Sequence, residues 1–145
     1  MRFFNWVSGR RRRKEEASAD ESPPTLHIYA SQPANSCVLI TMIEVNEAHI
    51  DEIIKVTKAK FGAKHRIVYV TDSVDFMRFL NQQAVFEYLP SRLEQSLHAS
   101  EMAWDSYMAR RWRLLISKWR PLHILSYGQN VEAFISATPR FVADD

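Results

Sequence analysis

Glycine, cysteine and long apolar runs are scarce in this sequence, and each shortage excludes a class of protein. The 145 residues include three glycines, Gly9, Gly62 and Gly128, so there is no G-x-G-x-x-G turn, no P-loop and no G-x-S-x-G elbow. The one cysteine, Cys37, excludes an intrachain disulfide and a cysteine-based zinc cluster, and we expect a buried thiol. No run of about 18 apolar residues exists, which argues against a transmembrane helix. The five histidines are scattered, so we expect neither a metal nor a cofactor.

Charge divides the chain into a tail and a domain. Residues 1–35 hold six basic and four acidic residues together with adjacent prolines, a composition typical of a disordered tail. Residues 36–145 therefore hold 13 residues of each sign. A neutral domain argues against nucleic acid as a partner, since domains that bind nucleic acid normally carry a basic face. The chain is expected to be cytoplasmic.

The tail carries two features that could have a role. Its basic block follows three aromatic residues and suits contact with an anionic membrane surface, which would place the protein at the membrane periphery: Arg10, Arg11, Arg12, Arg13 and Lys14. A solvated tail without a partner is the alternative. Residues 25–30 (TLHIYA) are a candidate extra edge strand.

The stretch from His65 to Pro90, HRIVYVTDSVDFMRFLNQQAVFEYLP, predicts a strand, a helix and a second strand. Residues 66–71 are apolar and β-branched, as in a strand that is buried on both faces. Asp72 and Ser73 are good N-cap residues, and Asp75 completes an acidic variant of the capping box. Val74, Met77 and Leu80 follow at helical spacing, with Phe76 and Phe79 beside them, and residues 84–90 form the second strand. This is a right-handed, parallel βαβ unit.

The flanking sequence extends the same alternation. Residues 37–45 predict a strand, Asn46 caps a helix, and Gly62 ends that helix in a left-handed conformation. A helical region from residue 91 to 119 should break near residues 98–100, because one helix of that length would span about 45 Å. We expect Trp112 in its buried face. Residues 122–127 predict a fourth strand, and Asn130 caps a last short helix. The order βαβαβαβα indicates an α/β fold, a three-layer Rossmann-like sandwich with about four parallel strands, over residues 36–145.

In such a sheet, ligands bind beyond the carboxyl ends of the strands, where the helices begin. Polar residues at those ends include Glu44, Glu87 and Tyr88. The two turns with small polar residues give the candidate ligand site: Thr71, Asp72, Ser73, Tyr127, Gly128, Gln129 and Asn130. The alternative is that Asp72 and Asn130 only cap helices.

The stretch 65–90 also resembles the second strand, helix and third strand in the N-terminal half of two-domain (GT-B type) glycosyltransferases, which often read "V.VVT…F…L…GV.V.YLP". WRPLHILSYG, residues 119–128, resembles their next helix end and strand. The resemblance covers roughly residues 37–137. It lacks the family's glycine-rich turn after the first strand and its C-terminal nucleotide-sugar domain.

This resemblance implies an acceptor-side module linked to cell-surface polysaccharide synthesis, inactive alone and acting with a second glycosyltransferase subunit. A non-enzymatic α/β protein-interaction or regulatory domain is the alternative.

Overall fold

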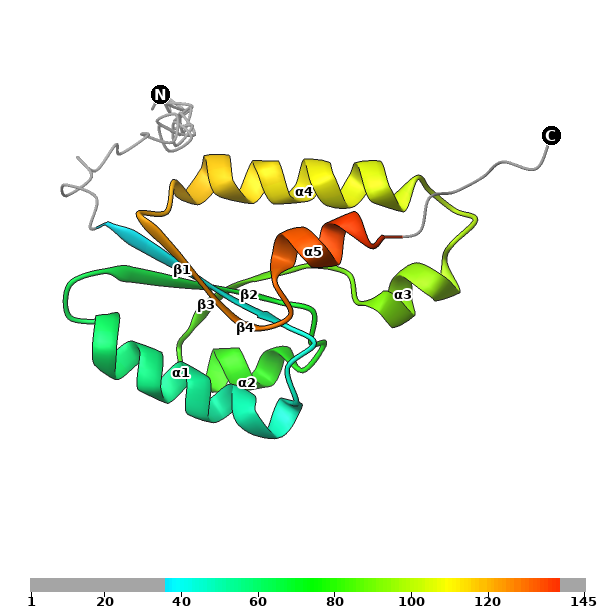
Figure 1. Cartoon of the computed structure of the whole chain (residues 1–145). Coiled ribbons are helices and arrows are strands. Elements are labelled where there is room, and N and C mark those ends of the chain that lie inside the picture. The colour runs from blue at the N-terminus through cyan, green and yellow to red at the C-terminus, as the bar shows by residue number, and fades with distance from the viewer. Residues whose placement is uncertain (1–35, 139–145) are drawn as a thin grey trace, which may run out of the picture. The chain divides into compact units, whose positions relative to one another are not determined.

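The structure is a computed structural model that describes residues 36–138. The expected tail, its basic block and the candidate strand at residues 25–30 lie outside the described residues. Within them, strands and helices alternate along the chain (Figure 1). The strands are β1 (Cys37–Ile43), β2 (Arg66–Thr71), β3 (Val85–Tyr88) and β4 (His123–Gly128). The helices are α1 (Glu47–Phe61), α2 (Phe76–Asn81), α3 (Arg92–Leu97), α4 (Trp104–Trp119) and α5 (Val131–Ser136).

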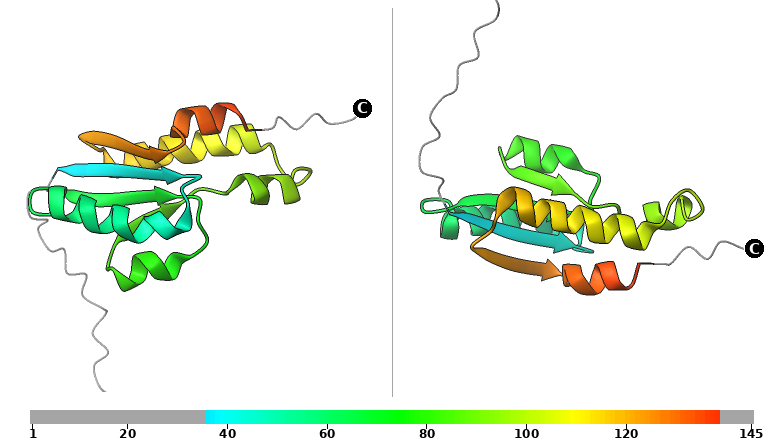
Figure 2. Two further views of the ribbon diagram at one scale, coloured as in Figure 1. Left: turned by 60° about the horizontal axis from the view of Figure 1, so that its bottom comes forward. Right: turned by 90° about the horizontal axis from the view of Figure 1, so that it is seen from above.

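The four strands form one parallel sheet in the order β3-β2-β1-β4. Helices α1 and α2 cover one face, and α4 and α5 cover the other (Figures 1 and 2). The predicted three-layer Rossmann-like sandwich is therefore confirmed. The chain moves outward from β1 to β3 and then crosses back to β4, so the order of the strands reverses between β1 and β4. That reversal is where open α/β sheets usually hold ligands.

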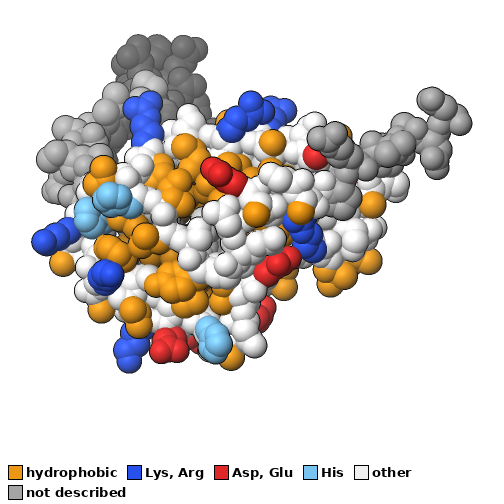
Figure 3. Space-filling view, viewed as in Figure 1, with side chains coloured by type: hydrophobic (Ala, Val, Ile, Leu, Met, Phe, Trp, Pro, Cys, Tyr) orange, Lys and Arg blue, Asp and Glu red, His pale blue; other side chains and the backbone are white. Residues whose placement is uncertain are grey.

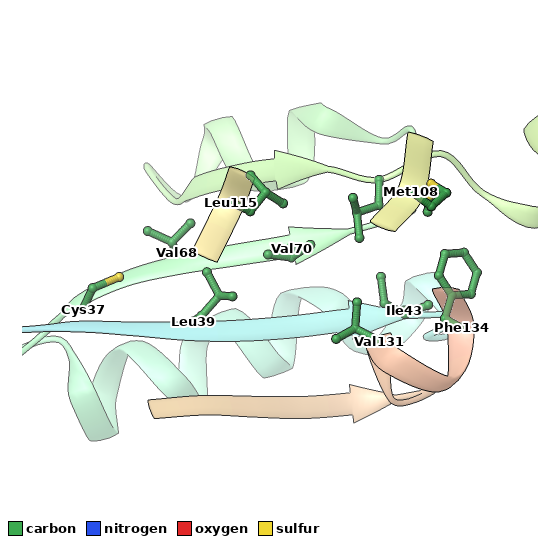
Figure 4. Packing of buried hydrophobic residues seen from close by; sticks show 10 residues of the cluster. Cys37, Leu39, Ile43, Val68, Val70, Met108, Leu115, Val131 and Phe134 are labelled. Atoms are coloured by element: carbon green, nitrogen blue, oxygen red, sulfur yellow. The ribbon is translucent and has the colours of Figure 1, made fainter. Parts of the chain in front are cut away.

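Two apolar layers hold the sheet between its helices. On the α4 face, Leu39, Val70 and Met108 belong to a buried cluster that also includes Cys37, as predicted (Figure 4). On the α1 face, Ile50, Ile54 and Phe79 pack on the other side of the same strands. Because β1 contributes to both layers, all seven of its residues are buried, as expected for a central parallel strand.

The ends of the elements differ from the prediction in two places. Strand β1 stops at Ile43, two residues early, because Glu44 adopts a positive φ of 54° and turns the chain out of the sheet. Gly62 ends α1 in a right-handed conformation (φ −62°, ψ −26°), so the predicted left-handed cap is wrong. Asn46 caps α1 as predicted, with its side chain accepting from the amide of Ala48.

The apolar stripe predicted for α2 is wrong. Val74, Met77 and Leu80 are 70%, 58% and 56% exposed, and Phe79 is the residue of this helix that enters the core. The ring of Phe79 lies 4.9 Å from the ring of Phe86 on β3, and this contact sets which side of the helix is buried. The predicted break before α4 is confirmed, since α3 ends at Leu97 and α4 begins at Trp104. Trp112 is half-buried and packs against the α4-face cluster rather than inside it.

Glu87 lies beneath α4 and not at the ligand edge, where the sequence placed it. Its carboxylate accepts from Lys118 Nζ at 2.6 Å, from Trp119 Nε1 at 2.8 Å and from Arg111 Nη2 at 3.1 Å. Burial opposes ionisation, but these hydrogen bonds and the two cations outweigh it and lower the pKa of Glu87. Arg111 and Lys118, two basic residues of α4, therefore anchor this helix to β3.

Candidate ligand site at the carboxyl edge

The parallel sheet brings the carboxyl ends of its strands to one edge. Glu44, Asp72 and Gln129 come directly after β1, β2 and β4 at this edge, and Tyr88 is the last residue of β3. The helices α1 and α5 begin there with caps from Asn46 and Asn130. The predicted cap by Asn130 is confirmed, since its Oδ1 accepts from the amides of Glu132 at 2.9 Å and Ala133 at 3.2 Å.

Asp72 does not cap the helix that follows it, so the predicted cap is wrong. The N-cap of α2 is Asp75, whose side chain makes no cap hydrogen bond. The Asp72 carboxylate instead accepts from the backbone amide of Glu44, at 3.1 and 3.3 Å from its two oxygens. It thereby ties the end of β2 to the positive-φ turn after β1. Burial and the neighbouring Glu44 raise the pKa of Asp72, against the hydrogen bond from the Glu44 amide and the charge of Arg92.

Thr71 and Ser73 use their hydroxyl groups within the protein. Both residues are buried. Thr71 Oγ1 accepts from the amide of Ser73 at 3.1 Å. Ser73 Oγ donates to Glu47 Oε1 at 2.9 Å and accepts from the amide of Asp75 at 3.2 Å. These two candidates therefore shape the loop after β2, and Asp72 is the member of this turn that remains half-buried at the edge.

The turn after β4 is built around Gly128 (φ +74°). A Cβ there would lie 2.2 Å from the carbonyl oxygen of Ile43, so another side chain would force the two strands apart. Gln129 follows, and its backbone amide donates to the same carbonyl at 2.8 Å. Its side-chain Oε1 is buried and accepts no hydrogen bond from the described residues. Within residues 36–138, this atom is a buried acceptor without a partner.

Tyr127 stands apart from the other candidates. It lines a hollow on the α1 face of the sheet together with His49, Glu52, Ile53 and Val56 of α1. The structure thus brings Asp72, Gly128, Gln129 and Asn130 to one edge but places Tyr127 on the face of the sheet.

Tyr88, which ends β3, and Ser91 and Arg92, which follow it, also belong to this edge, although none of them was in the candidate ligand site. The Tyr88 hydroxyl donates to the Glu94 carboxylate, and burial together with Glu94 raises the pKa of Tyr88 to about 12. Arg92 binds the carbonyl of Phe134 and lies 4.2 Å above the ring of that residue, which links α3 to α5. Ser91 caps α3 by accepting from the amide of Glu94, and this Ser-x-x-Glu pattern was the signal for a helix start here.

The edge is acidic overall. Helices α1, α4 and α5 each begin with a carboxylate, Glu47, Asp105 and Glu132, while α1 and α4 end with lysines at the opposite edge. Each placement favours its own helix dipole. Together with Glu44, Asp72 and Glu94, these residues make the edge unfavourable for a diphosphate, even though helix N-termini point there.

The described residues include one pair of the serine–histidine kind. Ser36 Oγ lies 2.6 Å from His65 Nδ1, at the opposite, amino edge of the sheet. No carboxylate among residues 36–138 pairs with His65, so the pair lacks the third member that orients a catalytic base. In the same part of the chain, no group of three His, Cys, Asp or Glu residues could hold a metal ion.

Comparison with known proteins finds no matching family model, curated protein or solved structure. No helix in residues 36–138 is both long and apolar enough to cross a membrane.

Proposed function

We propose that this chain is a non-catalytic, acceptor-side module of the glycosyltransferase type, which binds a neutral carbohydrate at its carboxyl edge and acts with a second protein that supplies the nucleotide sugar. One observation carries the proposal. Among residues 36–138, the edge beside the reversal of the sheet gathers hydrogen-bond acceptors: the carboxylates of Glu44 and Asp72, and the Oε1 of Gln129, which has no partner in that range. The cation at this edge, Arg92, is held by the carbonyl of Phe134.

The chemistry of these groups supports a polyhydroxylated ligand. Sugar hydroxyls donate hydrogen bonds, and ionised carboxylates accept them more strongly than neutral groups do. A buried Oε1 without a partner is costly, and a ligand hydroxyl would relieve that cost. A nucleotide sugar would instead bring a diphosphate next to Glu44 and Asp72. In this proposal the module binds the acceptor carbohydrate, and the second protein supplies the donor sugar.

Amide chemical shifts of the labelled full-length chain test the proposal. A neutral oligosaccharide series should move the amides of Glu44, Asp72, Gln129 and Asn130, while a nucleotide sugar at the same concentration should leave them in place. Gln129→Leu should abolish the carbohydrate-induced shifts with little change in stability. Glu132→Gln, which removes an exposed carboxylate from α5, should leave those shifts in place. The proposal would be contradicted if the nucleotide sugar alone moved these amides, or if none of the oligosaccharides did.

A second function, a non-enzymatic protein-interaction domain, has its own observation. Val74, Met77 and Leu80 of the α2 region are all more than half exposed and lie at a spacing of three residues, an arrangement typical of a surface that another protein covers. A photo-crosslinking residue at position 77 should then give one discrete adduct in the cells that make the protein, and the same residue at exposed position 64 should not. Identical adduct patterns from both positions would exclude this surface.

A further inference from the structure

Strand β4 leaves one side of its backbone open. Among the described residues it pairs with β1 alone. The Leu125 carbonyl faces Thr41 on β1, and the Gln129 amide donates to the carbonyl of Ile43. Because backbone groups alternate along a strand, the amides of Ile124 and Ser126 point away from β1. An unpaired row of this kind is a template for an added strand.

Apolar surface is uncovered on both faces of β4. On the α4 face, Trp112, Ile116 and Ile124 line a hollow, and Ile124 is 45% exposed. On the α1 face, Val56 and Tyr127 line a second hollow, and Val56 is 51% exposed. Figure 3, which views the molecule from the β4 side, shows hydrophobic side chains above and below the strip between the helical layers. An occupant of this edge must therefore present apolar side chains on both of its own faces.

We propose that the occupant is β4 of a second copy of this chain, which pairs antiparallel across a two-fold axis perpendicular to the sheet and makes one eight-stranded sheet. Strand β4 meets the requirement for the occupant, with Ile124 on one face and Leu125 and Tyr127 on the other. A two-fold axis perpendicular to the sheet does not exchange its two faces, so the α1 face of one copy continues into the α1 face of the other. This surface is separate from the carboxyl edge and does not depend on a carbohydrate ligand.

Charge favours the antiparallel direction and a like partner. The carboxyl edge is acidic through the first turns of its helices, with Glu47 and Glu132, and the amino edge is basic through Lys58 and Lys60 in the last turn of α1. An antiparallel copy places the acidic edge of each protomer beside the basic edge of the other. A parallel neighbour would place like charges together.

Proline at position 126 is the direct test. It removes an amide that points into the open side, and edge strands tolerate proline in that orientation. Ser126→Ala is the matched control, because it removes the same 2.9 Å hydrogen bond to Thr41 and keeps the amide. In sedimentation measurements, we expect the full chain and Ser126→Ala to show twice the 16.9 kDa of one chain, and Ser126→Pro to sediment as a folded monomer.

A second pair of variants decides the question if Ser126→Pro does not fold. Ile124→Lys should raise the dissociation constant at least tenfold. Leu114→Lys should leave it unchanged, since Leu114 is also about half exposed (54%, against 45% for Ile124) but lines neither hollow. Salt should weaken the dimer as well. A monomeric full chain, or a dimer that survives Ile124→Lys, would overturn the proposal; the latter places the contact on another surface.

Discussion

At the scale of single residues, several side chains expected to bind a ligand instead form hydrogen bonds within the protein, mostly with backbone amides. Thr71 and Ser73 hold the loop after β2, and Asp72 holds the positive-φ turn at Glu44. A left-handed residue other than glycine costs free energy, and a carboxylate that accepts from its amide offsets part of that cost. Asp72 is therefore a structural residue first, and its half-buried carboxylate is available to a ligand only from the edge.

Substitutions of Asp72 should separate these roles. Asp72→Ala leaves the Glu44 amide without its acceptor and should cost about 1 kcal/mol, while Asp72→Asn keeps an acceptor and should cost less. Since burial raises the pKa of Asp72, the folded protein binds this proton more tightly than the unfolded chain does. Its contribution to the free energy of unfolding should fall as the pH rises from about 3.9 through the folded pKa. Urea unfolding across this pH range measures the free energy of unfolding at each pH. If Asp72→Asn left the slope of this free energy against pH unchanged, Asp72 would not be the group responsible.

Glu87 should show the opposite sign. Because its pKa is lowered in the folded protein, the stability it contributes is present above the ordinary glutamate pKa of about 4.3 and is lost as the pH falls through the folded value. Glu87→Gln should cost about 1–3 kcal/mol at pH 7, since it withdraws a carboxylate from Lys118, Trp119 and Arg111. Exposed Glu132→Gln is the control for charge alone. Equal unfolding midpoints for the two variants would show that the cluster does not anchor α4.

At the scale of elements, the short helix α2 shows how two competing faces are resolved. Its sequence has apolar residues on more than one side, and Phe79 is the residue that reaches the core. The aromatic rings of Phe79 and Phe86 lie 4.9 Å apart, and Phe76 stacks on Phe86 at 5.3 Å, which fixes the rotation of the helix against β3. Met77 and Leu80 are left on the surface as a result.

Alanine substitutions in α2 should reveal this rotation. Phe79→Ala should cost about 3–5 kcal/mol, because it empties a fully buried site. Met77→Ala, two residues earlier on the same helix, should change the free energy of unfolding by no more than about 0.5 kcal/mol, as surface substitutions do. Chemical denaturation of the two variants gives both values. The reverse order would restore the stripe that the sequence predicted.

At the scale of the whole molecule, the domain has equal numbers of positive and negative residues, but the two signs at the helix ends lie at opposite edges of the sheet. Residues 36–145 carry 13 residues of each sign, yet acidic residues begin α1, α4 and α5, and lysines end α1 and α4. Because all helices that follow parallel strands begin at the same edge, each local preference for the helix dipole adds to one separation across the domain. The same separation disfavours anionic ligands at the carboxyl edge and favours an antiparallel copy at β4.

The basic block of the tail is the part of the chain suited to an anionic surface. Replacing Arg10, Arg11, Arg12 and Arg13 with glutamine should abolish binding of the full chain to vesicles that contain anionic lipid, and salt should weaken the binding of the unaltered chain. Removing four charges from exposed residues of the domain, Lys55, Lys60, Lys64 and Arg110, should leave vesicle binding in place. Co-sedimentation with the vesicles measures all three proteins. Binding that persists without the tail arginines would contradict an electrostatic role.

The sequence by itself determined the order and type of the elements and the caps at Asn46 and Asn130, because buried parallel strands and side-chain caps depend on neighbours close in the chain. Strand β2 was predicted on the same grounds, and the break before α4 was predicted from the length that one continuous helix would have. Only the tertiary structure decided which side of α2 is buried, where the Asp72 carboxylate goes and that Glu87 binds three side chains of α4. These depend on partners 24 to 32 residues away, or on a choice between apolar faces that packing makes. The same holds for the open edge at β4, since the order of strands in a sheet is set by crossovers that no local pattern encodes.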